Sequence, residues 1–308
     1  MFKKTIIAFL ISIAVLMGQE HAGLAGNYFQ YGVDARSIAM GNALAAGNNS
    51  QFPAFFNPAG VSALSDRKLL FSHQFLSLDR YQSVISFTAP LPPVAGISIG
   101  WIGAGVKYID GRDLVGIHTD ELKATENAFL ITFGIAPINR LHVGGTLKIL
   151  KNQLPNNDGN IIGKGVGFDF GILYKFIANG NIAIVVKNIN SAYQWSNKLT
   201  DDLGRVYKDK FPTQVVTGVQ YRINSVNIVG EVESFIAEGD YLGMGYKVGA
   251  EYSYDDYFFR AGYRNNRFAL GGGLLFKKYG KFDSFIDYAL VIEPVASLTH
   301  VISYAINF

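Results

Sequence analysis

The sequence predicts an all-β fold, an antiparallel transmembrane β-barrel of about fourteen strands with an N-terminal plug that contains a short helix. Three observations lead to this prediction. Polar and apolar residues alternate repeatedly after residue 68, charged residues occur within strands on the face opposite the apolar one, and the chain ends in an amphipathic strand that finishes with Phe308.

The alternation is clearest between residues 165 and 176. Val166, Phe168 and Phe170 begin a large apolar face, whereas Asp169 lies among glycines on the other face. Successive side chains of a strand point to opposite faces, so this pattern predicts a strand with one apolar side. A soluble β-sandwich shows the same alternation, so further features must decide between the two folds.

The position of the charged residues favours a barrel. They lie deep within predicted strands, on the face without large apolar residues. A dry core does not tolerate such charges, whereas a wet or plugged lumen does. Aromatic residues at strand ends, and strand lengths of about ten residues or more, also fit a wall that crosses a bilayer. The charges predicted to face the lumen are Lys148, Asp169, Lys187, Arg222, Glu231, Glu233, Arg260, Asp283 and Asp287.

The gaps between strands provide an independent check on the strand count. Short gaps follow the even-numbered strands, and the two longest gaps, 105–122 and 190–211, both follow odd-numbered strands. Short periplasmic turns and longer outer loops are the asymmetry expected of a single-chain outer-membrane barrel. The predicted strands are 68–78, 81–90, 94–104, 123–136, 140–151, 164–176, 181–189, 212–223, 225–235, 244–254, 256–264, 267–277, 280–291 and 298–308.

The last predicted strand carries an assembly signal. Tyr304 and Phe308 share its apolar register, and a terminal aromatic residue is the usual signal for outer-membrane assembly. A strand at the end of the chain also allows the barrel to close without an exposed edge. We therefore expect an outer-membrane location, with membrane lipid and the barrel-assembly machinery among the partners.

The N-terminus and the composition predict export. Residues 1–25 combine Lys3 and Lys4 with a short apolar run and small residues, which predicts a cleaved signal peptide, with an uncleaved anchor as the alternative. The chain contains no cysteine, which excludes disulfides and thiolate metal sites. Its 27 basic and 24 acidic residues give a formal charge of +3, too weak to indicate a nucleic-acid partner.

Residues 26–67 lack the alternation of the barrel domain, 68–308, and are predicted to form a plug inside it. The stretch 35–46 is rich in small residues and predicts a short helix capped by Asp34. A disordered leader is the alternative, but it would leave three phenylalanines in water. Asp34 and Arg36 are also available to pair with charges of the lumen.

This segment resembles the N-terminal signature of the fatty-acid-transporter-like (FadL) outer-membrane barrels, and in particular that of the PorV/PorQ branch. The signature is a small-residue stretch of the form GARxxAMGGA followed by NPAG. Asn42 stands where its second glycine is expected, and Asn48 and Asn49 stand where acidic residues are common. The matching positions are Gly32, Ala35, Arg36, Ala39, Met40, Gly41, Ala43, Asn57, Pro58, Ala59 and Gly60.

The resemblance implies a barrel with an internal N-terminal hatch and leaves the function divided. PorV-type proteins serve type IX protein secretion, whereas FadL-type proteins pass hydrophobic solutes such as fatty acids through the outer membrane. The short chain and its modest outer loops favour an accessory of type IX secretion, with secretion components as partners. A passage for hydrophobic small molecules is the first alternative, and a structural barrel without transport is the second.

No pattern in the sequence indicates catalysis, a metal site or a cofactor. Residues 96–100 match the hydrolase pattern G-x-S-x-G but continue as a strand instead of turning into a helix. The histidines show no ligand spacing. Glu231 and Glu233 lie about 7 Å apart on one strand face, and the basic residues predicted nearby favour salt links over acid/base catalysis. We therefore expect a non-enzymatic protein.

Overall fold

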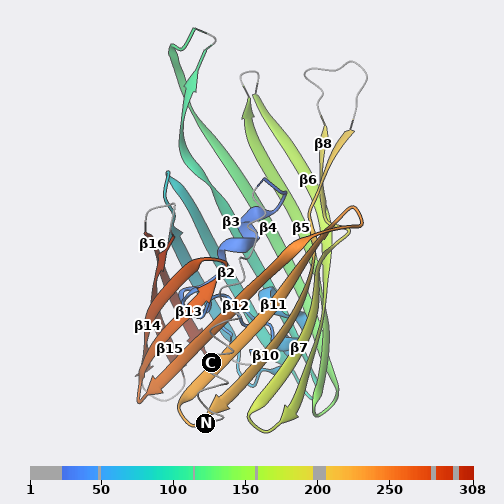
Figure 1. The fold of residues 1–308 in the computed structure, drawn as a ribbon, viewed down its shortest axis with the longest axis vertical. Coiled ribbons are helices and arrows are strands. Elements are labelled where there is room, and N and C mark those ends of the chain that lie inside the picture. The colour runs from blue at the N-terminus through green and yellow to red at the C-terminus, as the bar shows by residue number, and fades with distance from the viewer. Residues whose placement is uncertain are drawn as a thin grey trace.

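The structure, a computed structural model, describes residues 23–47, 50–113, 115–156, 159–196, 206–278, 282–293 and 298–308. In this part of the chain sixteen strands form one antiparallel sheet, and fourteen of them close into a barrel around the N-terminal segment (Figure 1). The prediction of an all-β barrel with fourteen strands is confirmed. The predicted signal peptide lies outside the described residues, except for residues 23–25.

The strands follow one another around the barrel, and β8 and β9 form a separate hairpin attached to β6. This side hairpin consists of β8 (Ala192–Ser196) and β9 (Val206–Lys210). The barrel strands are β1 (Lys68–Phe75), β2 (Arg80–Leu91), β3 (Ala95–Arg112), β4 (His118–Ile138), β5 (Leu141–Asn156), β6 (Gly159–Ile177), β7 (Gly180–Ile189), β10 (Thr213–Ile223), β11 (Val226–Ala237), β12 (Asp240–Tyr254), β13 (Tyr257–Arg264), β14 (Arg267–Lys278), β15 (Phe282–Ile292) and β16 (Thr299–Asn307).

The barrel closes between its first and last strands. β1 pairs with β16 over its whole length. Beyond this ladder Arg67 and Phe308 exchange both backbone hydrogen bonds, at 2.9 and 3.0 Å. Each of the fourteen barrel strands therefore has a neighbour on both sides, and the ring presents no open edge to another chain.

The outer face of the barrel is an apolar belt. Along β6, Phe168, Phe170 and Ile172 are exposed, whereas Asp169 between them is buried in the lumen. Phe170 exposes 62% of its surface, although burying such a side chain is worth about 1.5–3 kcal/mol. A closed belt of this kind is stable against hydrocarbon and not against water, so it faces the interior of a bilayer.

The barrel is taller on one side, where β3 to β6 rise above the other strands (Figure 1). β3, β4, β5 and β6 contain 18, 21, 16 and 19 residues, whereas β1 and β13 contain 8 each. The strand ends predicted at 104 and 123 are wrong, because β3 and β4 pair as far as Arg112 and His118. The backbone groups of this hairpin continue to pair after the apolar alternation of the side chains has ended. The hairpin of β8 and β9 likewise occupies part of the predicted 190–211 gap.

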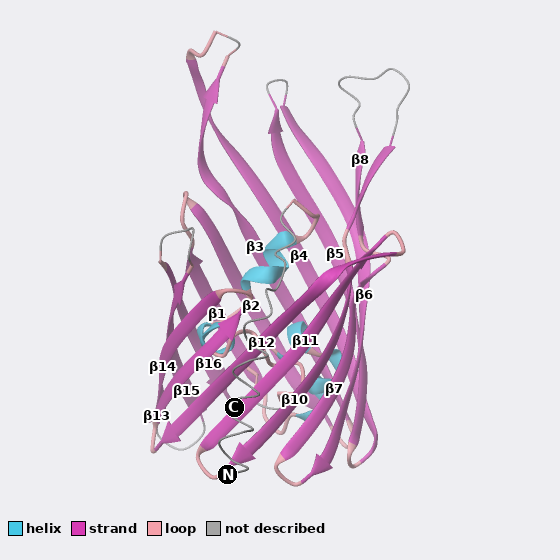
Figure 2. Ribbon diagram, in the orientation of Figure 1, coloured by secondary structure: helices cyan, strands magenta, loops and turns pink. Residues whose placement is uncertain are grey.

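Four short helical elements lie in the lumen and form the plug (Figure 2). Nearly all of the described residues from 32 to 61 are buried by the surrounding wall. No helix of the described residues is long and apolar enough to cross a membrane. The plug elements are η1 (Asn27–Tyr31), α2 (Ala35–Ala39), α3 (Pro53–Phe56) and η2 (Pro58–Ala63).

Helix α2 is shorter than the sequence predicts. Its start agrees with the prediction, because Asp34 accepts a hydrogen bond from the backbone N–H of Ser37 at 2.7 Å and the two residues form a capping box. The helix then ends where Gly41 and Asn42 adopt left-handed φ angles of 65° and 58°. The predicted continuation over residues 40–46 is therefore wrong, and turns replace it.

Glycines bring the plug into direct contact with the barrel wall. A Cβ atom added to Gly249 would overlap the backbone of Met40, and one added to Gly262 would overlap the backbone of Gly41. Gly271 makes the same kind of approach to Ala39, the last residue of α2. The wall strands β12 to β14 therefore approach the plug more closely than any larger residue allows.

We predict that Gly262→Val lowers the free energy of unfolding by about 1–3 kcal/mol, the usual cost of overpacking. The measurement is urea-induced unfolding in detergent micelles, followed by heat-modifiable gel mobility. Gly272→Val is the matched control, because the nearest atom to an added Cβ there is the carbonyl O of Phe258 at 3.8 Å. Equal losses of stability in the two variants would contradict the close contact between plug and wall.

Candidate functional site

The lumen and the plug within it form the candidate functional site. Ion-pairing residues gather on the inner face of β5 to β7 and β11 to β15. Apolar residues form a strip across the inner face of β1 to β5, between polar residues such as Gln74 and Gln82. The plug is therefore bound by ion pairs on one side, and by apolar contacts together with hydrogen bonds on the other.

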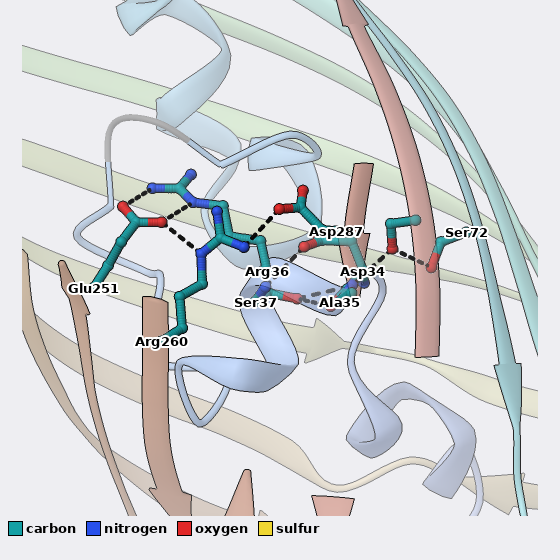
Figure 3. A network of polar contacts seen from close by, with 9 residues as sticks. Asp34, Ala35, Arg36, Ser37, Ser72, Glu251, Arg260 and Asp287 are labelled. Atoms are coloured by element: carbon teal, nitrogen blue, oxygen red, sulfur yellow. Dashed lines mark hydrogen bonds and ion pairs between the residues drawn. The ribbon is translucent and has the colours of Figure 1, made fainter. Parts of the chain in front are cut away.

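A chain of buried ion pairs binds helix α2 to the wall (Figure 3). Arg36 donates two hydrogen bonds to Glu251, from Nε to Oε2 at 2.7 Å and from Nη2 to Oε1 at 2.8 Å. Arg260 donates from Nε to the same Oε2 at 2.7 Å, and from Nη1 to Asp287 Oδ1 at 2.5 Å. Two arginines thus balance two carboxylates, as a buried cluster requires.

The plug also contains a buried carboxylate of its own, Asp34. Burial raises the pKa of Asp34, and the hydrogen bond from the Ser37 N–H opposes this rise. The next residue is bound by the wall, because the backbone N–H of Ala35 donates to Ser303 Oγ at 2.7 Å. The start of α2 is therefore fixed both by its own cap and by β16.

A second ion cluster lies on β11 to β13, beside the turn that follows α2. The backbone N–H of Ala45 donates to Glu231 Oε1. Lys247 Nζ lies 2.6 Å from Glu233 Oε2 and 3.5 Å from Glu231 Oε2. Arg264 Nη2 lies 3.7 Å from Glu233 Oε1. Two cations again balance two carboxylates, and one carboxylate also accepts from the plug.

Two lysines connect the wall to the aromatic residues of the plug. Lys148 Nζ lies 2.7 Å from Asp169 Oδ1, and Lys187 Nζ donates to the carbonyl O of Phe55 at 2.9 Å. Lys148 also lies 4.8 Å from the ring centre of Phe29, and Lys187 lies 5.0 Å from that of Phe55. Both distances permit cation–π attraction.

Asn57 joins the NPAG motif to the rest of the plug and to the wall. Its Nδ2 donates to the carbonyl O of Ala45 at 2.9 Å and to that of Ile172 at 3.1 Å. Its Oδ1 accepts from the backbone N–H of Ala59 at 3.0 Å. Gly171 leaves room for this amide, since an added Cβ would overlap it. Only a side chain with two donors and an acceptor satisfies all three partners.

The opposite side of the lumen carries the apolar strip, next to Gln74 and Gln82, which donate to the carbonyl O of Gly32 at 3.0 and 2.5 Å. Inward-facing residues of β1 to β5 are buried there against aromatic residues of the plug. Phe52 is fully buried, and its ring occupies the space that a side chain at Gly100 would need. The apolar wall residues are Leu70, Val84, Ile102, Ala104, Ala128, Leu130 and Leu150, and the plug residues in the same cluster include Tyr28, Phe52, Phe55 and Phe56.

The plug closes the lumen of the described barrel at the end opposite the short turns. The cavity beside η1 there has a volume of about 170 Å³ and is lined by Arg80, Arg264 and Arg267. Beside this cavity, Tyr193 of β8 lies edge-on to Phe211, with ring centres 5.0 Å apart.

The structure places the nine residues of the predicted plug motif inside the barrel, together with seven of the nine predicted lumen charges. Arg222 and Asp283 share the inward register of their strands but are exposed, because each lies next to a strand end. The buried motif residues are Gly32, Ala35, Arg36, Met40, Gly41, Asn57, Pro58, Ala59 and Gly60. Lys187 is half-buried, and the buried charges are Lys148, Asp169, Glu231, Glu233, Arg260 and Asp287.

Three charged residues of the site were not among the predicted ones. Glu251, Lys247 and Arg264 all join the ion clusters on β12 and β13. The alternation of the predicted strands 244–254 and 256–264 puts all three on the face opposite the tyrosines. Strand register alone is therefore sufficient to identify them as residues that face the lumen. The described residues contain no group of three or more His, Cys, Asp or Glu side chains able to hold a metal ion.

We predict that Glu251→Gln lowers the free energy of unfolding by roughly 3–5 kcal/mol, because it leaves Arg36 and Arg260 buried with one counter-charge fewer. Urea unfolding measures the loss, and limited proteolysis shows whether the plug loosens before the barrel. Asp110→Asn is the control, because the Asp110–Arg112 pair is exposed and contributes little. Similar midpoints for all three proteins would rule out a central role for Glu251.

We predict a smaller loss for Asn57→Ala, about 1–3 kcal/mol, because the substitution leaves the carbonyl groups of Ala45 and Ile172 without this donor. The same unfolding assay applies. Asn156→Ala, in the β5–β6 hairpin away from NPAG, serves as the comparison. A loss no larger than that of the comparison would show that Asn57 does not join the motif to the wall.

No family model matches the sequence, and no protein with a curated description matches it. Solved barrel structures do match. The CymD monoaromatic hydrocarbon channel has a TM-score of 0.63 at 14% identity, with 90% of this chain and 97% of that one covered. The toluene transporter TodX of Pseudomonas putida has a TM-score of 0.61 at 13% identity, with 90% of this chain and 97% of that one covered. A FadL homologue of Pseudomonas aeruginosa has a TM-score of 0.61 at 10% identity, with 90% of this chain and 98% of that one covered. At these identities the likeness shows the fold, and the chain has the barrel fold of these outer-membrane proteins.

Proposed function

We propose that this chain is a non-enzymatic outer-membrane channel for small hydrophobic solutes. The observation that carries the proposal is the apolar strip on the inner face of β1 to β5, in the same cluster as Phe52 of the plug. A water-filled porin lines its lumen with polar groups. A lumen with an apolar strip offers a hydrophobic solute a surface that water and ions do not compete for.

The apolar side of the plug is also the side that a solute displaces at the lower free energy. A hydrophobic solute replaces the apolar contacts of the Phe52 ring with contacts of the same kind. Separating Arg36 from Glu251 instead leaves buried charges uncompensated, which costs about 3–5 kcal/mol. We therefore place the route between the plug and β1 to β5, with helix α2 remaining attached to the opposite wall.

The structural neighbours support this class of solute. CymD is described as a monoaromatic hydrocarbon channel and TodX as a toluene transporter, and both share the barrel fold of this chain. Small aromatic hydrocarbons are compatible with a route lined by leucine, isoleucine, valine and phenylalanine. They are therefore the first solutes to test.

The accessory role in type IX secretion, expected from the PorV/PorQ resemblance, stays a prediction, and the neighbours favour the solute-passage alternative instead. Cleavage of the signal peptide, and the role of Tyr304 and Phe308 in recognition by the barrel-assembly machinery, also stay predictions. Both aromatic residues face outward on the described barrel, where such recognition requires them.

Uptake of radiolabelled toluene by Gram-negative cells tests the proposal, because plain phospholipid vesicles are themselves permeable to toluene. We predict faster uptake when the outer membrane contains the protein, and severalfold faster uptake with Phe52→Leu, which frees space beside Gly100. Phe71→Leu is the matched control, because Phe71 lies on the outer face of β1 and is 42% exposed. Uptake no faster than in cells without the protein would refute solute passage and leave a structural barrel.

A disulfide between plug and wall tests which side of the plug moves. The Cβ of Ala45 lies 3.4 Å from the position of a Cβ at Gly218, close to the roughly 3.5–4.5 Å of a disulfide, and the chain has no cysteine of its own. With Ala45→Cys and Gly218→Cys combined, oxidation should leave uptake unchanged. Uptake that stops on oxidation and returns with a reductant would show instead that the plug moves as a unit.

A further inference from the structure

The outer face of the barrel is hollowed over β6, β7 and β10 to β14, on the wall that β10 to β13 form at the front of Figure 1. The groove has a volume of about 1060 Å³. Its floor contains the small outward-facing residues Gly230, Ala250 and Ala261. Ala250 pairs with Ala261 across β12 and β13, and Gly230 of β11 pairs with Val248, two residues before Ala250. Larger apolar residues, such as Ile184 and Val248, form the sides.

The same part of the wall has the plug directly behind it. Gly249 and Gly262 point inward against Met40 and Gly41, one position along each strand from the groove residues Ala250 and Ala261. The wall therefore has small residues on both faces at this level. The plug fills the inner side, so the outer side is where an occupant is needed to complete the packing.

The chemistry of the groove indicates hydrocarbon. The charges of β11 and β12, Glu231, Lys247 and Glu251, are buried on the lumen side. The exposed side chains of the groove are uncharged, and apart from Thr217 they are apolar or tyrosine. The groove is also continuous with the apolar belt that faces the bilayer, which includes Phe170. An occupant with buried charges or many polar groups would find no partners here.

One end of the groove offers groups that suit a phospholipid head. Tyr174 and Tyr221 line the groove near the short turns that follow β6 and β10, and both pair with β7. Both tyrosines are exposed on the outer face. Tyrosine hydroxyls at this depth match the ester groups of a phospholipid.

We propose that the groove binds the acyl chains of one phospholipid, with the ester groups at the end that carries Tyr174 and Tyr221. The lipid supports the wall from outside where Met40 and Gly41 contact it from within. The inference rests on the proposed membrane location of the barrel and not on solute passage.

Native mass spectrometry tests the proposal. The barrel is purified in mild detergent, incubated with palmitoyl-oleoyl phosphatidylglycerol vesicles, purified again and weighed. Gly230→Leu fills the floor without a clash, because an added Cβ there meets nothing closer than 3.9 Å. Gly272→Leu is the matched control, a substitution at an outward glycine that does not line the groove, with the nearest atom at 3.8 Å.

We expect one bound lipid on the wild-type protein and on Gly272→Leu. The amount of lipid bound to Gly230→Leu should be about tenfold lower, the effect expected when the lipid loses contacts worth roughly two buried methylene groups. Equal retention by both variants, or no lipid on a folded wild-type barrel, would overturn the proposal. A dimer that Gly230→Leu dissociates would identify a second copy as the occupant. Lipid retention is measured without any solute, so its failure and a failure of toluene uptake are separate results.

Discussion

The plug depends on one carboxylate, that of Glu251, which accepts hydrogen bonds from both Arg36 and Arg260. A barrel of fourteen strands has a lumen that must be filled by water or by protein. Filling it with protein buries charges of the wall, and each buried charge needs a partner. Arg36 provides that partner from the plug. The charges of the wall are therefore balanced only when the N-terminal segment lies inside the closed barrel.

This requirement makes the lumen asymmetric. The ion clusters on β11 to β15 fix α2 and the turn after it, and they separate only at a high cost in free energy. Along β1 to β5 the plug packs against the apolar strip, whose contacts depend little on direction, and accepts hydrogen bonds from Gln74 and Gln82. The same plug is therefore held by ion pairs on one side and by weaker contacts on the other.

Strand register made most of the fold predictable from sequence, because period-two alternation assigns each side chain to one of two faces. It could not give depth, so Arg222 and Asp283 were placed on the correct face but not near the mouth. It also could not show pairing beyond the apolar belt, as in β3 and β4. The predicted helix over 35–46 was too long because small residues favour helix, whereas Gly41 and Asn42 take left-handed angles set by their contact with the wall.

The left-handed residue Gly41 lies in the turn where the plug backbone contacts the inner face of the barrel wall. The turn at Gly41 brings the plug backbone against Gly262, and the contact is possible only where the wall carries no side chain inward. The neighbouring outward positions, Ala250 and Ala261, are small as well, so the wall is thin at this level on both faces. The plug backbone and an occupant of the outer groove therefore pack against neighbouring residues of β12 and β13 from opposite sides.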